Sequence, residues 1–164
     1  MKPKTKTKKK REYEWKSVFL HICGKNLDPD KISDILHIQP DSSGKRGEIR
    51  GKRKCKQGYW TLDGGSSTLR FETLMRRILK RISPVKRQLQ ELIRDDETIK
   101  EAHLTIAFAP PRECPNACYC FDAKLINEFT SIGIDIALSI HIIERWEKLY
   151  AEVEEKSKKQ RRKK

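Results

Sequence analysis

The densest group of chemically active side chains lies in one glycine-rich stretch, residues 44–58, with the sequence GKRGEIRGKRKCKQG. Cations this close together can neutralise successive phosphates, and each contact releases counterions and adds salt-dependent affinity. The stretch therefore predicts a nucleic-acid contact, while the alternative interpretation is a solvated connector between two elements. The candidate binding residues are Lys45, Arg46, Arg50, Lys52, Arg53, Lys54 and Lys56.

A second group of cations follows at Arg76, Arg77, Lys80 and Arg81. If this segment is helical, these positions form a stripe beside the apolar face. We take Arg77 and Arg81 as candidates that extend the phosphate-binding surface. The alternative is that the stripe is only the solvated side of an amphipathic helix.

The remaining excess of positive charge is at the two ends of the chain. Residues 1–11, 45–56 and 156–164 each hold seven Lys and Arg, and with the single Glu48 they carry +20, whereas the rest of the chain has 16 basic and 22 acidic residues. Polybasic segments bind RNA, DNA or anionic membranes without reading sequence. Because the N-terminus has no lipidation motif, we expect RNA or DNA as the polyanion. The alternative is that the tails only aid solubility.

Five cysteines, an odd number with no secretory segment before them, predict a reducing, cytoplasmic location. Cys114, Cys118 and Cys120 are weak candidates for a zinc site, with His103 or Cys55 as a fourth ligand. Structural zinc sites usually use two Cys-x-x-Cys pairs, and this chain has one cluster of different spacing. We therefore expect no bound metal and no other cofactor.

No catalytic constellation is evident. The four histidines, His21, His37, His103 and His141, have no partner at a recognisable spacing, and all but His37 lie in segments predicted as strands. The stretch from Asp63 to Ser67 resembles an anion-binding nest, but it lacks the Gly-Lys-Ser/Thr ending of a P-loop and is better interpreted as a turn and helix cap. We expect a non-enzymatic protein, and a small enzyme with an unrecognised site stays as an alternative.

Hydrophobic periodicity and turn residues predict the elements that position these side chains. Four strands are expected, at 13–23, 59–62, 98–109 and 134–143. Helices are expected after caps at Asp28, at Ser67 or Thr68 and at Asp122, with a further helix from Pro84 that either continues the preceding one through a kink or is separate. The order predicts an α+β domain with a roughly four-stranded sheet and helices packed on one face, plus a charged C-terminal helix.

Composition divides the chain into three parts. Residues 1–12 have no apolar side chain after Met1 and are predicted to be a disordered basic tail. Residues 13–143 are expected to form the single α+β domain, and 144–164 a charged helix and basic tail. The apolar run at 18–23 is too short for a membrane span, so none is expected.

Three stretches carry a family resemblance: GKNLDPDKISDILHIQPD at 24–41, KRGE at 45–48 leading to GYWTL at 58–62, and, more weakly, FDAKLINEFTSIGIDIALSIHI at 121–142. Together they resemble a bacterial family described as domain of unknown function 4279. The resemblance covers roughly residues 15–143. It implies a compact α+β domain with no assigned catalytic residues, and it places Trp60 at the start of a strand, which favours a core position over a base-stacking one.

The most favoured function from the sequence is an uncharacterised domain that binds RNA or DNA non-specifically through its basic loop and tails. The alternative is a protein-binding or immunity-type interaction module, in which the mildly acidic body contacts the partner.

Overall fold

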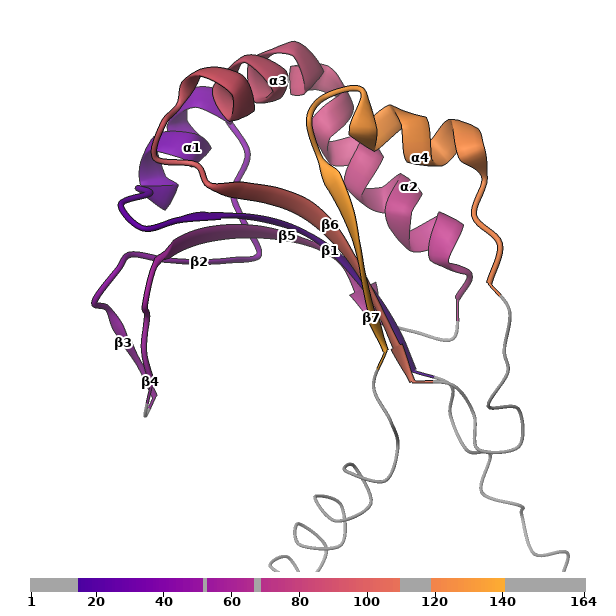
Figure 1. Cartoon of the computed structure of the whole chain (residues 1–164), viewed down its shortest axis with the longest axis horizontal. Coiled ribbons are helices and arrows are strands. Elements are labelled where there is room, and N and C mark those ends of the chain that lie inside the picture. The colour runs from indigo at the N-terminus through magenta and orange to yellow at the C-terminus, as the bar shows by residue number, and fades with distance from the viewer. Residues whose placement is uncertain (1–14, 52, 67–68, 110–118, 141–164) are drawn as a thin grey trace, which may run out of the picture.

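The computed structural model describes residues 15–51, 53–66, 69–109 and 119–140 (Figure 1). Within these residues the chain forms a five-stranded sheet and a separate two-stranded hairpin. The elements are β1 (Trp15–Gly24), α1 (Pro29–Leu36), β2 (Ser42–Gly44), β3 (Ile49–Arg50), β4 (Arg53–Lys54), β5 (Gly58–Ser66), α2 (Phe71–Ile82), a 3-10 turn (Ser83–Val85), α3 (Lys86–Asp95), β6 (Glu101–Ala109), α4 (Ala123–Thr130) and β7 (Asp135–Ile140).

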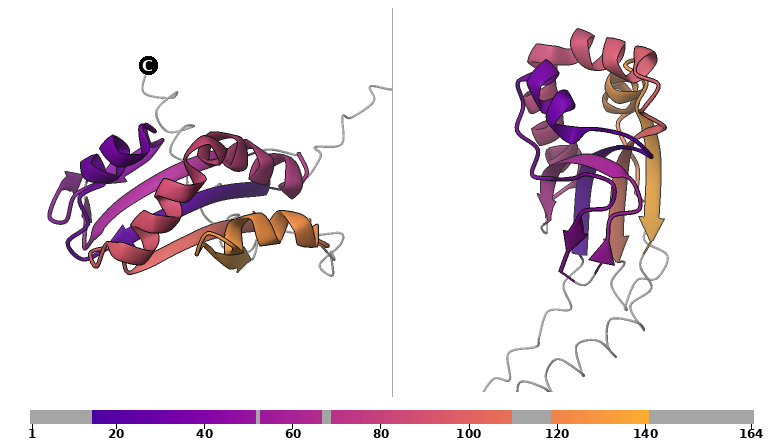
Figure 2. Two further views of the ribbon diagram at one scale, coloured as in Figure 1. Left: turned by 90° about the horizontal axis from the view of Figure 1, so that it is seen from above. Right: turned by 90° about the vertical axis from the view of Figure 1, so that its left-hand side faces the viewer.

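The strand order in the sheet is β2-β5-β1-β6-β7. β1 pairs antiparallel with β5 and β6, whereas β7 is parallel to β6 and is reached through a crossover that contains α4. The helices lie together on one side of the curved sheet (Figures 1 and 2). The predicted α+β class with one covered face is confirmed. The fifth strand is β2, a three-residue strand in which Ser43 lies opposite Trp60.

The core lies between this sheet and the helices. Val18, Leu20 and Ile22 of β1 are fully buried there. Trp60 is 0% exposed, and its indole N–H donates to Ser33 Oγ at 3.1 Å, which satisfies its one polar atom. The prediction that Trp60 belongs to the core is therefore confirmed.

Two helix starts follow the predicted capping chemistry. Asp28 Oδ1 accepts from the Asp30 amide at 3.1 Å at the start of α1, and Asp122 Oδ1 accepts from the Lys124 amide at 2.9 Å at the start of α4. The helix expected from Pro84 is separate from α2, because the 3-10 turn Ser83–Val85 interrupts the run. The cap expected at Ser67 or Thr68 is wrong, because α2 begins at Phe71 with Arg70 at its N-cap position and no side-chain hydrogen bond there.

The glycines at 64 and 65 do not form the predicted turn and cap, because both belong to β5. Gly65 has φ +98°, and the β1–β5 register shifts beside it, as at a β-bulge. A Cβ on Gly64 would lie only 2.6 Å from the carbonyl oxygen of Leu74 in α2. The pair of glycines therefore lets α2 approach the strand backbone closely.

The expected basic tail at 1–12, the expected helix at 144–164 and the residues Lys52, Cys114, Cys118 and His141 lie outside the described residues. Among the helices that the structure describes, none combines the length and apolar character that a membrane span requires.

Candidate functional site: a basic hairpin beside the open face of the sheet

The glycine-rich stretch is a hairpin, which we call the basic hairpin (residues 45–57). In it, Ile49 pairs with Lys54 and Arg50 with Arg53. The Gly47 amide donates to Cys55 O at 2.8 Å, and the Cys55 amide donates to Glu48 O at 2.9 Å. Gly51 supplies a φ of +60° at the tip, a conformation that glycine adopts without strain. Figure 1 shows β3 and β4 extending away from the sheet on the side opposite the helices.

Three contacts of Lys45 and Arg46 fix the base of the hairpin. Lys45 Nζ lies 2.7 Å from Asp30 Oδ2 and 3.1 Å from Asp28 Oδ1, and the hydrogen bond from Lys45 lowers the pKa of Asp28. Arg46 Nη1 donates to Asn26 Oδ1 at 3.4 Å. These two cations are therefore engaged within the domain.

Arg50 connects the hairpin to the sheet. Its Nε donates to Glu48 Oε1 at 3.0 Å, and its guanidinium lies 5.6 Å from the centre of the Tyr59 ring on β5. The hydrogen bond from the Lys45 amide, and then that from Arg50, lower the pKa of Glu48, so this carboxylate is already occupied by contacts within the hairpin.

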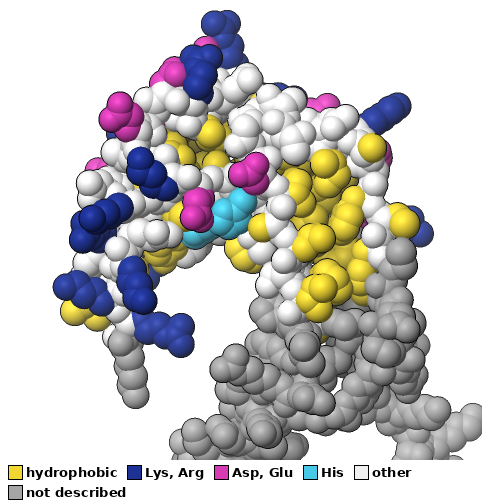
Figure 3. All heavy atoms as spheres, viewed as in Figure 1, with side chains coloured by type: hydrophobic (Ala, Val, Ile, Leu, Met, Phe, Trp, Pro, Cys, Tyr) yellow, Lys and Arg dark blue, Asp and Glu magenta, His cyan; other side chains and the backbone are white. Residues whose placement is uncertain are grey.

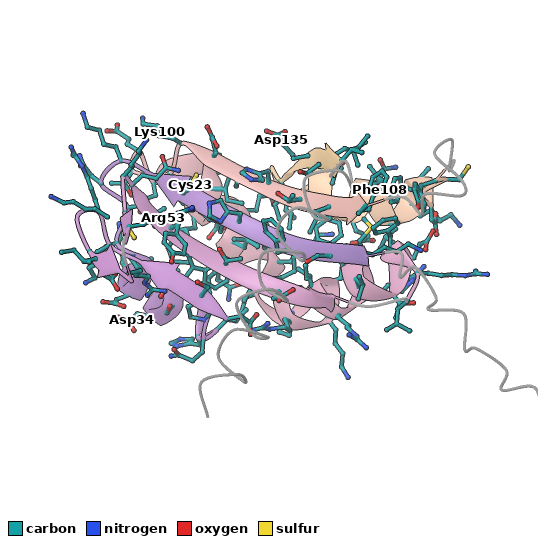
Figure 4. The ribbon with its side chains drawn as sticks, turned by 90° about the horizontal axis from the view of Figure 1, so that it is seen from below. Cys23, Asp34, Arg53, Lys100, Phe108 and Asp135 are labelled. Atoms are coloured by element: carbon teal, nitrogen blue, oxygen red, sulfur yellow. The ribbon has the colours of Figure 1, made fainter. Side chains whose placement is uncertain are left out.

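The other described cations of the hairpin project into solvent. Arg53, Lys54 and Lys56 are exposed, and no carboxylate forms an ion pair with them within the part of the chain that the structure describes. Seen from below, Arg53 lies over the end of the sheet that carries Cys23 (Figure 4). These three side chains are the ones available to an external anion.

Arg77 and Arg81 are not brought together with the hairpin. Arg77 Nη1 donates to Gly64 O at 3.3 Å, while Arg81 pairs with Asp41 and donates to Gln39 O at 2.8 Å. Both belong to α2, in the helical layer, whereas the hairpin extends on the other side (Figure 1). Their contacts attach α2 to β5 and to the segment that precedes β2.

The side of the sheet without helices, which we call the open face, carries a row of three rings. His21 lies opposite both Thr61 and His103 on the neighbouring strands, and its Nδ1 is 2.9 Å from Thr61 Oγ1. The His21 ring is stacked with Tyr59, with 5.9 Å between ring centres, and lies 5.3 Å from the His103 ring. We call Tyr59, His21 and His103 the ring row. Figure 3 shows the histidines next to acidic side chains, with Lys and Arg side chains gathered farther out on the hairpin side.

Two carboxylates lie beside the ring row on β6 and β7. Glu101 Oε2 is 4.0 Å from His103 Nδ1 and accepts the Cys23 thiol hydrogen at 3.7 Å. Asp135 lies opposite His103 in the β6–β7 register and is exposed. The open face is therefore bordered by cations on the hairpin side and by carboxylates on the β6–β7 side.

Burial and neighbouring charges keep the central groups neutral. Burial, and then the proximity of His103, lower the pKa of His21, although Glu101 opposes this. Burial, and then Glu101, raise the pKa of the Cys23 thiol to about 11. His21 is thus a neutral imidazole at neutral pH, and Cys23 is a protonated thiol, which is a poor nucleophile and a poor metal ligand.

Among the described residues, no three His, Cys, Asp or Glu side chains converge in a way that holds a metal ion. Cys120 is exposed, and Cys55, which lies in the basic hairpin, is partly exposed.

His21, His103 and His141 were expected on strands, and the two of them that the structure describes, His21 and His103, are there. Sequence reasoning missed that they face each other and Tyr59. The parity of each strand was the available signal, but the contact depends on the pairing register of three strands that are far apart in the chain.

An α+β domain with one helix-covered face and one open face is thus the class that the structure defines. Residues 11–142 match the family model of a domain of unknown function, DUF4279, and the chain belongs to that family. No curated protein and no solved structure is significantly similar to it.

Proposed function

We propose that this protein binds nucleic acid, RNA or DNA, without sequence preference through the basic hairpin, with help from its polybasic ends. The observation that carries the proposal is the exposure of Arg53, Lys54 and Lys56 on a projecting hairpin, without ion-pair partners among the described residues. A cation without an internal partner keeps its full charge available to a phosphate.

The electrostatic environment supports this assignment. The only carboxylate in residues 45–56 is Glu48, and it already accepts hydrogen bonds from Arg50 and from the Lys45 amide. The charges of the hairpin that are left without a partner among the described residues are therefore all positive. Each phosphate that it neutralises releases counterions, so the binding constant falls steeply with salt.

The test is a fluorescence-anisotropy titration of the full-length protein with labelled RNA and DNA across a salt series. Changing Arg53, Lys54 and Lys56 together to Glu is expected to weaken binding more than ten-fold at low salt. It should also reduce the slope of log K against log salt by about 3, close to 0.9 for each lost contact with a duplex.

The matched control changes three exposed cations of the helical side, Arg70, Lys80 and Lys124, to Glu. This variant has the same net charge as the hairpin variant. If net charge alone governed binding, both variants would lose the same affinity, and equal losses would contradict the assignment to the hairpin.

A protein partner is the second candidate, and edge strand β7 favours it. Leu138 and Ile140 are 61% and 62% exposed there, and an exposed edge strand can pair with a strand from another chain. A photo-crosslinking amino acid at position 138, with position 124 on α4 as the control, would yield a protein adduct in cells under this hypothesis and a nucleic-acid adduct or none under the first.

A further inference from the structure

The ring row lies directly beside the basic hairpin. The Arg50 guanidinium is 5.6 Å from the centre of the Tyr59 ring, Tyr59 stacks with His21, and His21 lies 5.3 Å from His103. A ligand held by the hairpin would therefore have a continuous row of rings next to it, across β5, β1 and β6. No described helix covers this face (Figures 1 and 4).

These rings suit the flat faces of unpaired bases. Tyr59, His21 and His103 are partly exposed, and the lowered pKa of His21 keeps its ring neutral at physiological pH. Aromatic rings on a sheet surface stack with bases of single strands, and this stacking tolerates any sequence because every base has a flat face.

The distribution of charge across the open face favours single-stranded nucleic acid over a duplex. Cations lie on the hairpin side, whereas Glu101 and Asp135 lie on the β6 and β7 side of the ring row. A duplex placed on this surface would bring its second phosphate backbone toward these carboxylates and would hide its base faces. A single strand can keep its phosphates at the hairpin and place its bases on the rings.

We propose that the open face binds unpaired bases of a single-stranded nucleic acid, and that Glu101 and Asp135 select bases with an exocyclic amino group. Cytosine and adenine carry an amino group that donates to a carboxylate, and uracil and thymine do not. This inference rests on the proposed function, because the hairpin supplies the phosphate contacts that hold the strand in place.

The test uses the full-length protein and labelled 12-mers of rC, rA, rU, dC and dT, with a 12-base-pair mixed-sequence DNA duplex. Tyr59→Leu and His103→Asn remove a ring while keeping much of the side-chain volume. Each is expected to lower single-strand affinity about ten-fold with little effect on the duplex. Glu101→Gln is expected to reduce the preference for rC and rA over rU.

Matched controls make the same chemical changes elsewhere. His37→Asn removes an exposed histidine at the end of α1, where φ is +51° and Asn is well tolerated, and Glu97→Gln neutralises an exposed carboxylate outside the open face. Both should bind every oligomer as the wild type does. Thermal unfolding of each variant confirms that the fold is retained.

Three outcomes separate this inference from the proposed function. If the wild type binds duplex and single strands equally and the ring variants bind normally, the open face is not a base-binding surface, while a loss in the hairpin variant would still support the proposed function. If the ring variants lose affinity and the hairpin variant does not, the proposed function is wrong. If single strands are preferred but rU binds as well as rC and rA, the role of Glu101 and Asp135 is overturned.

Discussion

The two faces of the sheet differ in burial: one faces the helices and forms the core, and the other faces solvent. On β1, Val18, Leu20 and Ile22 point to the helices and are fully buried. Phe19 and His21, which alternate with them, point to the open face and are partly exposed. Because side chains alternate along a strand, one strand can build the core with one parity and a ligand surface with the other. Substitutions on the helical side should therefore change stability, whereas substitutions at the adjacent positions on the open face should change ligand binding.

The largest expected difference is between Trp60 and its neighbour Tyr59. Trp60→Ala is expected to lower the free energy of unfolding by about 3–5 kcal/mol, because it leaves a cavity in the core. Tyr59→Ala, on the open face, should cost about 1 kcal/mol. Urea unfolding of both variants measures the two costs, and similar values would contradict the division of roles between the faces.

Gly64→Ala is expected to cause the next largest loss of stability. The added methyl would lie 2.6 Å from Leu74 O and 3.0 Å from Val18 O, so α2 must move away from the sheet. Overpacking of this kind costs about 1–3 kcal/mol. Both contacts are with backbone atoms, so truncating the Leu74 side chain in a Gly64→Ala/Leu74→Ala variant should give no recovery. Recovery in the double variant, measured by thermal unfolding, would show that side-chain packing is the cause.

Local chemistry was enough to predict much of the helical side from the sequence. The core position of Trp60 was favoured by the family resemblance, since its strand neighbour Tyr59 is partly exposed. The caps Asp28 and Asp122, in contrast, act through hydrogen bonds to residues two positions away. Such signals are complete within a few residues, so no knowledge of the tertiary structure is needed.

The candidate site could be predicted only in part, because it depends on non-local pairing. The density of cations marked residues 45–56, but it did not show that Lys45 is paired with Asp28 and Asp30 while Arg53 is not. The ring row needs the registers of β5, β1 and β6, which no local pattern specifies. The turn and cap predicted for Gly64 and Gly65 were wrong for the same reason, because these glycines allow α2 to approach β5 closely, which is a non-local contact.

Asp96→Asn tests a polar contact on the helical side. Asp96 Oδ2 lies 2.8 Å from Lys31 Nζ, and Thr98 donates to its Oδ1 from the amide at 2.9 Å and from the hydroxyl at 2.6 Å. These contacts lower the pKa of Asp96 to about 2. Because the pKa is lower in the folded state, the carboxylate stabilises the fold above its unfolded pKa of about 4, and this stability is lost as pH falls toward 2.

The variant should therefore be about 1 kcal/mol less stable than the wild type above pH 5, with the Lys31 pair partly screened by solvent. The difference should shrink between pH 4 and pH 2, as urea unfolding at each pH would show. A difference that stays constant with pH would mean that the ionised form of Asp96 is not what stabilises this contact.

On the open face, the protonation of His21 should change the stability of the fold at a higher pH than that of Asp96 does, and for a different reason. Burial lowers the pKa of His21 below its ordinary value of 6.5, so the unfolded state binds a proton that the folded state resists. The free energy of unfolding should therefore decrease as pH falls from about 6.5, and His21→Gln should show a flatter dependence between pH 7.5 and pH 5.5. His37→Asn is the control, because His37 is exposed at the end of α1 and its removal leaves the burial of His21 intact. If His21→Gln and His37→Asn gave equal pH profiles, the burial of the His21 ring would not be coupled to stability.

Protonation of the two residues lowers stability in different pH ranges, below about pH 4 for Asp96 and below about pH 6.5 for His21. The pH at which stability falls therefore shows whether the helical side or the open face of the sheet is responsible.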